Sequence, residues 1–322
     1  MKNAIRTLMT ELVDYAGLFP PAELAMDEAV RRYASYATEG IEASFGLDAP
    51  MLGRFIVPAA RLEEFATVIE TEWVVTRQCM WRLTLLASGD AEADRRAVER
   101  LMNHERVSSR VVVEGLELLR KEQIEPARLD PMLRTYASML GRVRERGRQA
   151  IYVESSTAAL PALIPVLRAH GLGAKLRMGG VTPEAIPSCA EVANFVAQCA
   201  AAKIPIKATA GLHHALRGEH PLSSAPDAPV ATMHGYLNLL TAVLLAEAGA
   251  PQLELEAALW SASAADFTLT PESFRWREHR FGVNRLVALR RHGVVGFGSC
   301  SFLEPVETLA ALVDPCQQRE TA

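Results

Sequence analysis

The sequence predicts an α/β protein of the (β/α)8 TIM-barrel type with an N-terminal helical extension. From residue 53 onward, short runs rich in β-branched residues alternate with segments of helical periodicity. This alternation is typical of parallel strands joined by right-handed helical crossovers, and eight such runs are enough to close a barrel. The length of 322 residues also suits one barrel of about 250 residues with insertions. The predicted strands are Arg54–Ala59, Trp81–Ala87, Arg110–Val113, Gln149–Glu154, Gly173–Met178, Pro205–Ala210, Asp266–Thr270 and Val294–Phe302.

The chain divides at two expected boundaries. Residues 1–52 are expected to form the helical extension, packed on a barrel that spans residues 53–313, and residues 314–322 are expected to form a tail. Within the extension, the segment 14–21 reads DYAGLFPP and interrupts the helical pattern. It suits either a loop that caps the mouth of the barrel or a rigid connector with a hydrophobic plug.

Composition restricts the partners of the protein. The formal net charge of -4 and the pI near 6.1 argue against nucleic acid, which is bound by basic surfaces. The most apolar run, residues 236–246, is much shorter than the ~20 residues that a membrane span needs. The N-terminus has the pattern of neither a signal nor a transit peptide, and the five cysteines are scattered, so we expect a cytoplasmic protein with reduced thiols. A homo-oligomer is compatible with the sequence.

Cationic side chains lie inside two predicted strands. Lys207 and Thr209 are two residues apart and share a face of one strand, as Lys175 and Arg177 do on the strand before it. A lysine within a strand is costly unless it is paired or used. Together these cations suggest a pocket for a small anionic molecule, and crowding among them would favour a neutral, nucleophilic lysine. The alternative is a structural salt network in the barrel core, with Glu114 and Glu154 as partners.

Other candidates lie where strands end, the position at which barrel enzymes carry their active sites. Glu154 closes one strand, and the histidines His213 and His214 follow Lys207 in the next loop. Cys300 is interpreted as a small buried thiol, which is a more common role than that of a nucleophile. The candidate substrate-binding residues are Lys175, Arg177, Thr209, Gly179, Gly180, His234, Asn238, Ser299 and Ser301.

The histidines also permit a metal interpretation. His213, His214 and Glu154 are ligand types found in zinc and iron sites, but the sequence has no HxH or HExxH motif. We therefore predict no cofactor, with a divalent metal as the alternative. One histidine acting in acid–base chemistry is the expectation for this loop.

Two resemblances cover these motifs. The phrases DYAGLFPPA, KLRMGGVTPEAIPS, IKATAGLHHALRG and FGSCSFLEPV are similar to those of a bacterial protein family without an assigned activity, over residues 14 to 306. The short motif Ile206–Gly211 resembles the Schiff-base lysine strand of the deoxyribose-phosphate aldolase family, and Lys175–Gly180 resembles its second lysine strand, although the order of the two is reversed here. This likeness spans about a dozen residues and implies a barrel with a lysine-centred site.

The leading functional prediction is an enzyme of lyase or isomerase type that acts on a small anionic carbonyl or carboxylate compound. Lys207 is the expected nucleophile or base, with Glu154, His213 and His214 as further catalytic residues. Two alternatives remain open: a metal-dependent hydrolase or lyase that uses the His213 and His214 region, and a ligand-binding barrel without catalysis.

Overall fold

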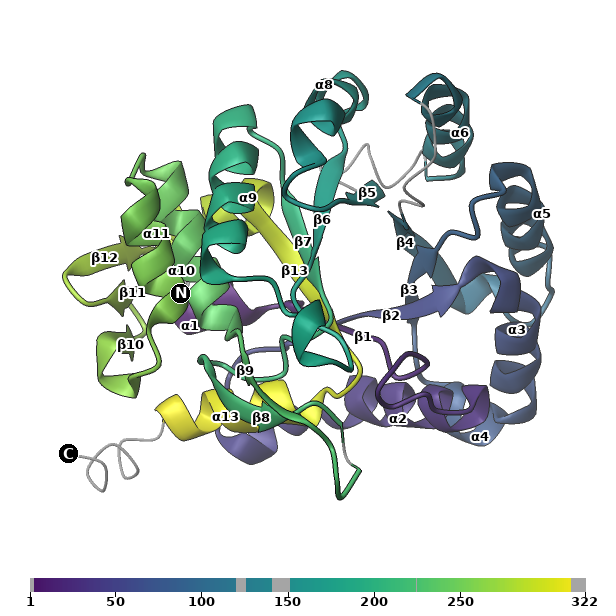
Figure 1. Ribbon diagram of the computed structural model, residues 1–322. Helices are drawn as coiled ribbons and strands as arrows, with labels where there is room; N and C mark the ends of the chain where they lie inside the picture. Colours follow the sequence, from purple (N-terminus) through teal and green to yellow (C-terminus); the bar gives the residue numbers. More distant parts are fainter. Residues whose placement is uncertain (1–2, 120–125, 141–150, 224, 314–322) are drawn as a thin grey trace.

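The computed structural model of the protein describes residues 3–119, 126–140, 151–223 and 225–313, and it has a closed barrel of eight parallel strands (Figure 1). The predicted (β/α)8 fold is confirmed. Around the barrel the strands follow the order β1, β2, β3, β4, β5, β6, β7 and β13, and β13 closes the ring by pairing with β1. Their bounds are β1 Val13–Tyr15, β2 Leu52–Pro58, β3 Trp81–Leu86, β4 Val111–Leu118, β5 Ile151–Glu154, β6 Gly173–Arg177, β7 Ile206–Thr209 and β13 Val294–Ser299.

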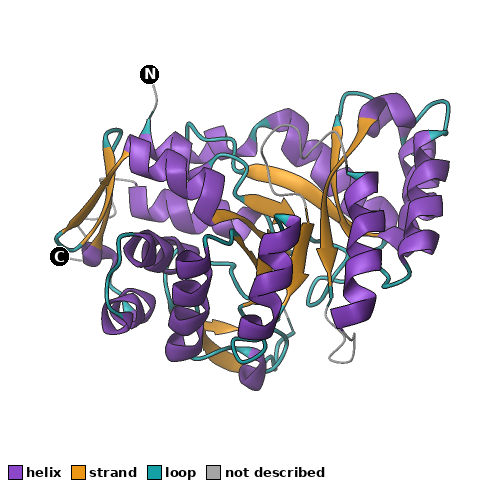
Figure 2. Ribbon diagram, turned by 90° about the horizontal axis from the view of Figure 1, so that it is seen from above, coloured by secondary structure: helices purple, strands orange, loops and turns teal. Residues whose placement is uncertain are grey.

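Helices surround the strands (Figure 2). Most begin shortly after a strand ends, as the alternating pattern predicts. A capping box starts α9, with Ser188 and Glu191 bonded to each other's backbone. The helices are α1 Ala4–Met9, α2 Met26–Glu39, α3 Leu62–Thr71, α4 Trp73–Thr76, α5 Ala91–Met102, α6 Pro126–Met139, α8 Leu160–His170, α9 Cys189–Ala202, α10 Tyr236–Glu247, α11 Gln252–Trp260, α12 Val283–Ala288 and α13 Leu303–Val313. In the part of the chain that the structure describes, no helix is both long and apolar enough to cross a membrane.

The predicted seventh strand is not part of the barrel. Within the predicted strand Asp266–Thr270, the structure forms β10 (Phe267–Leu269), the first strand of an antiparallel sheet with β11 (Ser273–Trp276) and β12 (His279–Gly282). Both views place this sheet at the edge of the molecule, away from the barrel (Figures 1 and 2). A short β-branched run has the same local pattern in either setting, so the sequence does not distinguish them.

The missing barrel strand comes from the N-terminus. β1 lies within residues 1–52, the segment expected to be helical and outside the barrel, and it pairs in parallel with both β2 and β13. The boundary expected at residue 53 therefore falls after the first barrel strand. β1 has three residues and all are buried, so it shows no alternation between apolar and polar positions. The expected tail, residues 314–322, and the first two residues of the predicted strand Gln149–Glu154 lie outside the described residues.

The seam between β1 and β13 is tightly built. A side chain at Gly296 would place its Cβ 2.8 Å from the carbonyl oxygen of Leu12, so only glycine allows this approach. Near the seam, the half-buried Arg290 donates hydrogen bonds from its guanidinium to the backbone carbonyls of Val294 and Val295 at 2.8 and 2.7 Å, and to that of Thr10 at 2.9 Å. One side chain thus ties together the two segments that lead into the closing strands.

Aromatic side chains pack between the first strands and the helices outside them. Tyr15, Phe55 and Trp81 point outward from β1, β2 and β3, and they contact the rings of Tyr33 on α2 and Phe65 on α3. The Tyr33 hydroxyl donates a hydrogen bond to the backbone carbonyl of Gly53 at 2.9 Å. Because residues alternate along a strand, this packing turns the neighbouring side chains, such as Asp14 and Arg54, toward the barrel interior.

Strand β4 is longer than predicted. It continues to Leu118, and the register shifts against β3 between Leu83 and Thr84, where one extra residue of β4 is accommodated. Glu117, expected in the loop after this strand, is consequently inside it and 2 % exposed.

Candidate active site

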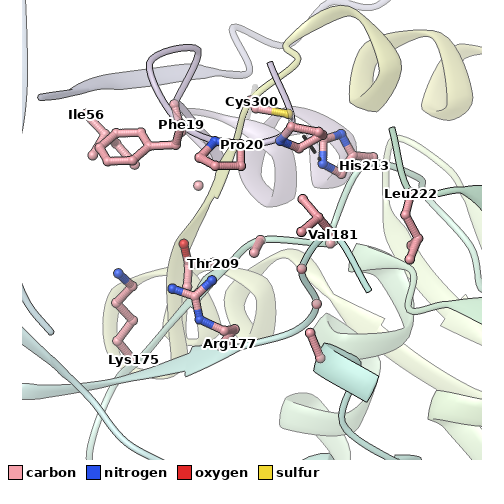
Figure 3. Close-up of a pocket in the computed structure, with 18 of the residues that line it drawn as sticks. Phe19, Pro20, Ile56, Lys175, Arg177, Val181, Thr209, His213, Leu222 and Cys300 are labelled. Atoms are coloured by element: carbon pink, nitrogen blue, oxygen red, sulfur yellow. Dashed lines mark hydrogen bonds between the residues drawn. The ribbon is translucent and has the colours of Figure 1, made fainter. Parts of the chain in front are cut away.

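A cavity of about 440 Å³ opens at the ends of the barrel strands where active sites of this fold lie (Figure 3). Its volume suits a small molecule. The segment DYAGLFPP contributes to it, because Asp14 and Tyr15 belong to β1 and the loop that follows brings Phe19, Pro20 and Pro21 to the cavity wall. Of the two interpretations of this segment, the loop at the mouth is the one that the structure supports.

A chain of alternating charges crosses the barrel interior. The Lys207 ammonium contacts the Asp14 carboxylate and lies 2.8 Å from Glu117. Glu117 is also 2.7 Å from the Lys175 ammonium. Lys175 in turn lies 3.0 Å from Glu154, and Arg177 is 3.1 Å from the same carboxylate. Three cations are thus matched by three carboxylates, and the chain runs from the buried interior to a half-exposed guanidinium.

This arrangement fixes the charge of its central members. Burial alone would raise the pKa of Glu117, but the ammonium groups of Lys175 and Lys207 outweigh burial and lower that pKa to about 2. Burial would lower the pKa of Lys207, but the carboxylates of Asp14 and Glu117 outweigh it and raise that pKa above its ordinary value. Lys207 therefore carries a proton at neutral pH, whereas a Schiff-base nucleophile must be neutral.

Lys207 and Lys175 face different spaces. Lys207 and Asp14 border a second cavity on the other side of the charge chain, with Arg54, Arg82 and Tyr152. Lys175, Arg177 and Thr209 line the mouth cavity, and Figure 3 shows them at one end of it. Of the predicted cations, Lys175 and Arg177 are therefore the two that a ligand in the mouth can reach.

A sulfur, an imidazole and a carboxylate lie at the other end of the mouth cavity. The sulfur of Cys300 is 3.7 Å from Nε2 of His213, and Nδ1 of His213 is 2.7 Å from a carboxylate oxygen of Glu304 on α13. Figure 3 shows Cys300 and His213 side by side above the cations. Cys300 is half-buried and lines the cavity, so it is more exposed than the small buried thiol that the sequence favoured.

His213 is held in its charged form. Burial disfavours the imidazolium, but the hydrogen bonds and negative charges of Cys300 and Glu304 outweigh it and raise the pKa of His213 to about 10. The imidazolium in turn lowers the pKa of the Glu304 carboxyl. At neutral pH, His213 is therefore a proton donor toward the cavity.

His214 has the opposite character. Its ring stacks on that of His220 with the centroids 3.4 Å apart. His220 belongs to the hairpin of β8 (Gly218–Pro221) and β9 (Val230–Met233). Burial, followed by the charges of His220 and His213, lowers the pKa of His214 to about 4. The hairpin also supplies Leu222 and Met233 to the cavity wall, so His214 secures one wall of the mouth.

The predicted glycine pair shapes the cavity by close packing. A side chain at Gly211, whose φ is +72°, would come within 2.9 Å of the Cα of Gly179. A Cβ at Gly180 would meet Ala185 at 2.7 Å. Gly179 and Gly180 both line the cavity, and the first brings the loops after β6 and β7 into backbone contact.

Two predicted binding residues serve the scaffold instead. Nε2 of His234 lies 2.7 Å from the carbonyl oxygen of Pro187. The Asn238 amide donates to the carbonyls of Ala258 and Ser261, and its oxygen accepts from the amide of Arg217. Neither side chain lines the mouth cavity.

Ser299 and Ser301 flank the cavity without lining it. The hydroxyl of Ser299 is 3.5 Å from Nδ1 of His213, whereas the hydroxyl of Ser301 accepts the backbone N–H of Glu304 in the first turn of α13. Both therefore position residues of the site instead of contacting a ligand there.

The predicted metal ligands are not assembled. Glu154 is bonded to Lys175 and Arg177, whereas His213 is bonded to Glu304 and His214 stacks on His220. Among the described residues, donor atoms close enough to share a metal ion occur only at Glu254, Glu278 and His279.

Three residues of the site were not among the candidates that the sequence indicated: Asp14, Glu117 and Glu304. Asp14 was hidden in a strand of three residues, and Glu117 was assigned to a loop. Glu304 follows Cys300 by four residues within the phrase FGSCSFLEPV. The polar residues of this phrase are the sequence signal for this end of the site.

Comparison of the chain with family models, with curated proteins and with solved structures finds no match in any of the three.

Proposed function

We propose that the protein is an enzyme that binds a small carbonyl compound carrying a carboxylate and moves a proton at that compound, as lyases and isomerases do. The observation that carries this proposal is the charge chain, because Lys175 and Arg177 at one end of it line the same cavity as His213. Arg177 would hold the carboxylate and Lys175 would polarise the carbonyl oxygen, with Thr209 orienting the substrate. His213, which is charged at neutral pH, would deliver a proton to the substrate, supported by Glu304.

Exchange of hydrogen for deuterium tests this proposal without knowledge of the net reaction. In D2O, the protein is incubated with pyruvate, 2-oxobutyrate or 2-oxoglutarate, and proton NMR follows the C–H groups next to the carbonyl. We expect at least one compound to exchange about tenfold faster than in buffer. Arg177→Gln should abolish the gain, whereas Arg168→Gln, a matched change at an exposed arginine on α8, should retain it. Binding without exchange would favour a ligand-binding barrel instead.

A Schiff base on Lys207 is the second candidate, and the similarity of Ile206–Gly211 to an aldolase strand favours it. The raised pKa of Lys207 argues against it. Treatment with borohydride in the presence of the same oxo acids, followed by peptide mass spectrometry, separates the two. We expect no reduced adduct on Lys207, and a stoichiometric adduct there would replace the acid–base proposal.

A further inference from the structure

The described cysteines differ sharply in their surroundings. Cys79, Cys189 and Cys199 are buried, and burial raises the pKa of each thiol, to about 12 for Cys79. Such thiols are inert. Cys300 is half-buried, lines the mouth cavity and has an imidazole nitrogen 3.7 Å from its sulfur. Within the described residues it is therefore the cysteine placed to react.

The imidazole beside it is oriented by a third group. Nδ1 of His213 is occupied by Glu304 at 2.7 Å, which leaves Nε2 directed at the sulfur. This is the order of nucleophile, base and orienting carboxylate that activates cysteine and serine in covalent catalysis. A half-exposed Glu304 side chain on the first turn of an 11-residue helix completes the set.

The cations that line the cavity indicate which kind of molecule would react with the Cys300 sulfur. Lys175 and Arg177 line one end of the 440 Å³ cavity, and Cys300 and His213 lie at the other (Figure 3). Apolar side chains, among them Phe19, Ile56 and Leu222, form much of the remaining wall. A short molecule with an anion at one end and an electrophilic carbon at the other fits this division.

We propose that Cys300 is a covalent nucleophile that attacks the carbonyl carbon of a small oxo acid while Arg177 holds its carboxylate. In this step the sulfur forms a bond to the carbonyl carbon, the electron pair of the C=O π bond moves to the oxygen, and His213 delivers to that oxygen the proton that came from the thiol. The product is a hemithioacetal or hemithioketal, and no other reactant is consumed. The assignment of Arg177 rests on the proposed function, whereas the activation of Cys300 by His213 and Glu304 stands without it.

Alkylation with two reagents of similar size tests both the activation of Cys300 and the role of Arg177 in holding a carboxylate. Iodoacetate carries a carboxylate and iodoacetamide is neutral, and both alkylate thiolates with loss of iodide. The rates at Cys300 are measured at pH 6.5 by peptide mass spectrometry in a Cys316→Ser background and normalised to N-acetylcysteine. At this pH an ordinary thiol is almost fully protonated. Cys79 and Cys199 serve as internal controls that stay unmodified.

We expect Cys300 to react about tenfold faster than the reference with both reagents, with a further gain of about fivefold for iodoacetate. His213→Gln and Glu304→Gln should remove the common gain, and Arg177→Gln should remove only the gain for iodoacetate. Circular dichroism confirms that each variant is folded, and the half-exposed Glu304 provides the milder change. If Cys300 is alkylated at the same rate as the reference and His213→Gln does not change that rate, the proposal that Cys300 is an activated nucleophile is overturned. If Cys300 reacts faster than the reference with both reagents but shows no preference for iodoacetate, its role as nucleophile stands and the assignment of Arg177 as the carboxylate-binding residue is overturned.

Discussion

The charge of Lys207 depends on two carboxylates that the chain brings from distant positions. Asp14 comes from the first barrel strand and Glu117 from the fourth, and both lie against the ammonium group of Lys207, a residue that is 3 % exposed. Removing such a group leaves its partners buried without a counter-charge, which costs more than the ion pair contributes in the intact protein.

Lys207→Met should therefore lower the free energy of unfolding by about 3–5 kcal/mol, because Asp14 and Glu117 lose their shared cation. Urea denaturation followed by circular dichroism measures the loss. The double variant Lys207→Met with Asp14→Asn removes one of the stranded charges and should recover part of it. Equal stability of the single variant and the wild type would contradict the role given to this ion pair.

At the scale of residues, the sequence predicts the direction in which a side chain points better than it predicts the ion-pair partner of that side chain. Alternation along a strand correctly places Lys175 and Lys207 inside the barrel, and a salt network was an open alternative for them. The expected partners were Glu114 and Glu154; Glu154 lies 3.0 Å from Lys175, but Glu114 is bonded to Arg54 and Arg82. An extra residue in β4 sets which glutamate reaches the lysines, and this irregularity leaves no pattern in a single sequence.

The hairpin of β8 and β9 is an element whose position depends on neutral histidines. The stacked rings of His214 and His220 join it to the loop after β7, and burial lowers the pKa of both side chains. A group whose pKa is lowered in the docked state binds a proton more readily when it is released. Docking is therefore strongest above the ordinary histidine pKa near 6.5 and weakens as the pH falls toward about 4.

Hydrogen exchange across residues 218–233 measures this dependence. After correction for intrinsic rates, protection at pH 5 should be about tenfold lower than at pH 7, because the two imidazoles bind protons more readily once the hairpin is released. His220→Phe keeps a ring in the stack and removes one charge, so its protection should change much less with pH. A wild-type hairpin with the same protection at both pH values would show that the histidines do not control it.

The elements themselves were predicted unevenly, for physical reasons. Strands with β-branched runs followed by helices, such as β2 and β13, were found from their pattern. The residues 266–270 carry the same pattern, but they pair with β11 because the hairpin to β11 is close in sequence. Periodicity reports that a segment is extended and leaves its pairing partner undetermined.

At the scale of the whole molecule, the barrel closes through its first and last strands. β1 is only three residues long, yet its pairing with β2 and β13 completes the ring, and Asp14 within it completes the charge chain. The sequence predicted the number of strands correctly while assigning one of them wrongly. The number of strands was predicted correctly because the chain length and the alternation of strands and helices reflect the barrel architecture. Which short buried segment forms a strand depends instead on contacts between residues nearly 300 positions apart.

A chain that begins at Gly53 tests which division of the molecule is correct. If residues 1–52 were an extension, the remainder would fold with native helix content. We expect instead that it aggregates or shows no cooperative thermal transition, because β2 and β13 would each present an unpaired edge and Lys207 would lose Asp14. Circular dichroism and size-exclusion chromatography give the readout. Co-expression of residues 1–50 as a separate fragment should restore a cooperative transition, since that fragment carries β1, whereas a fragment with Asp14→Asn should restore it less well. A chain of residues 53–313 that folds cooperatively alone would mean that closure by β1 is dispensable.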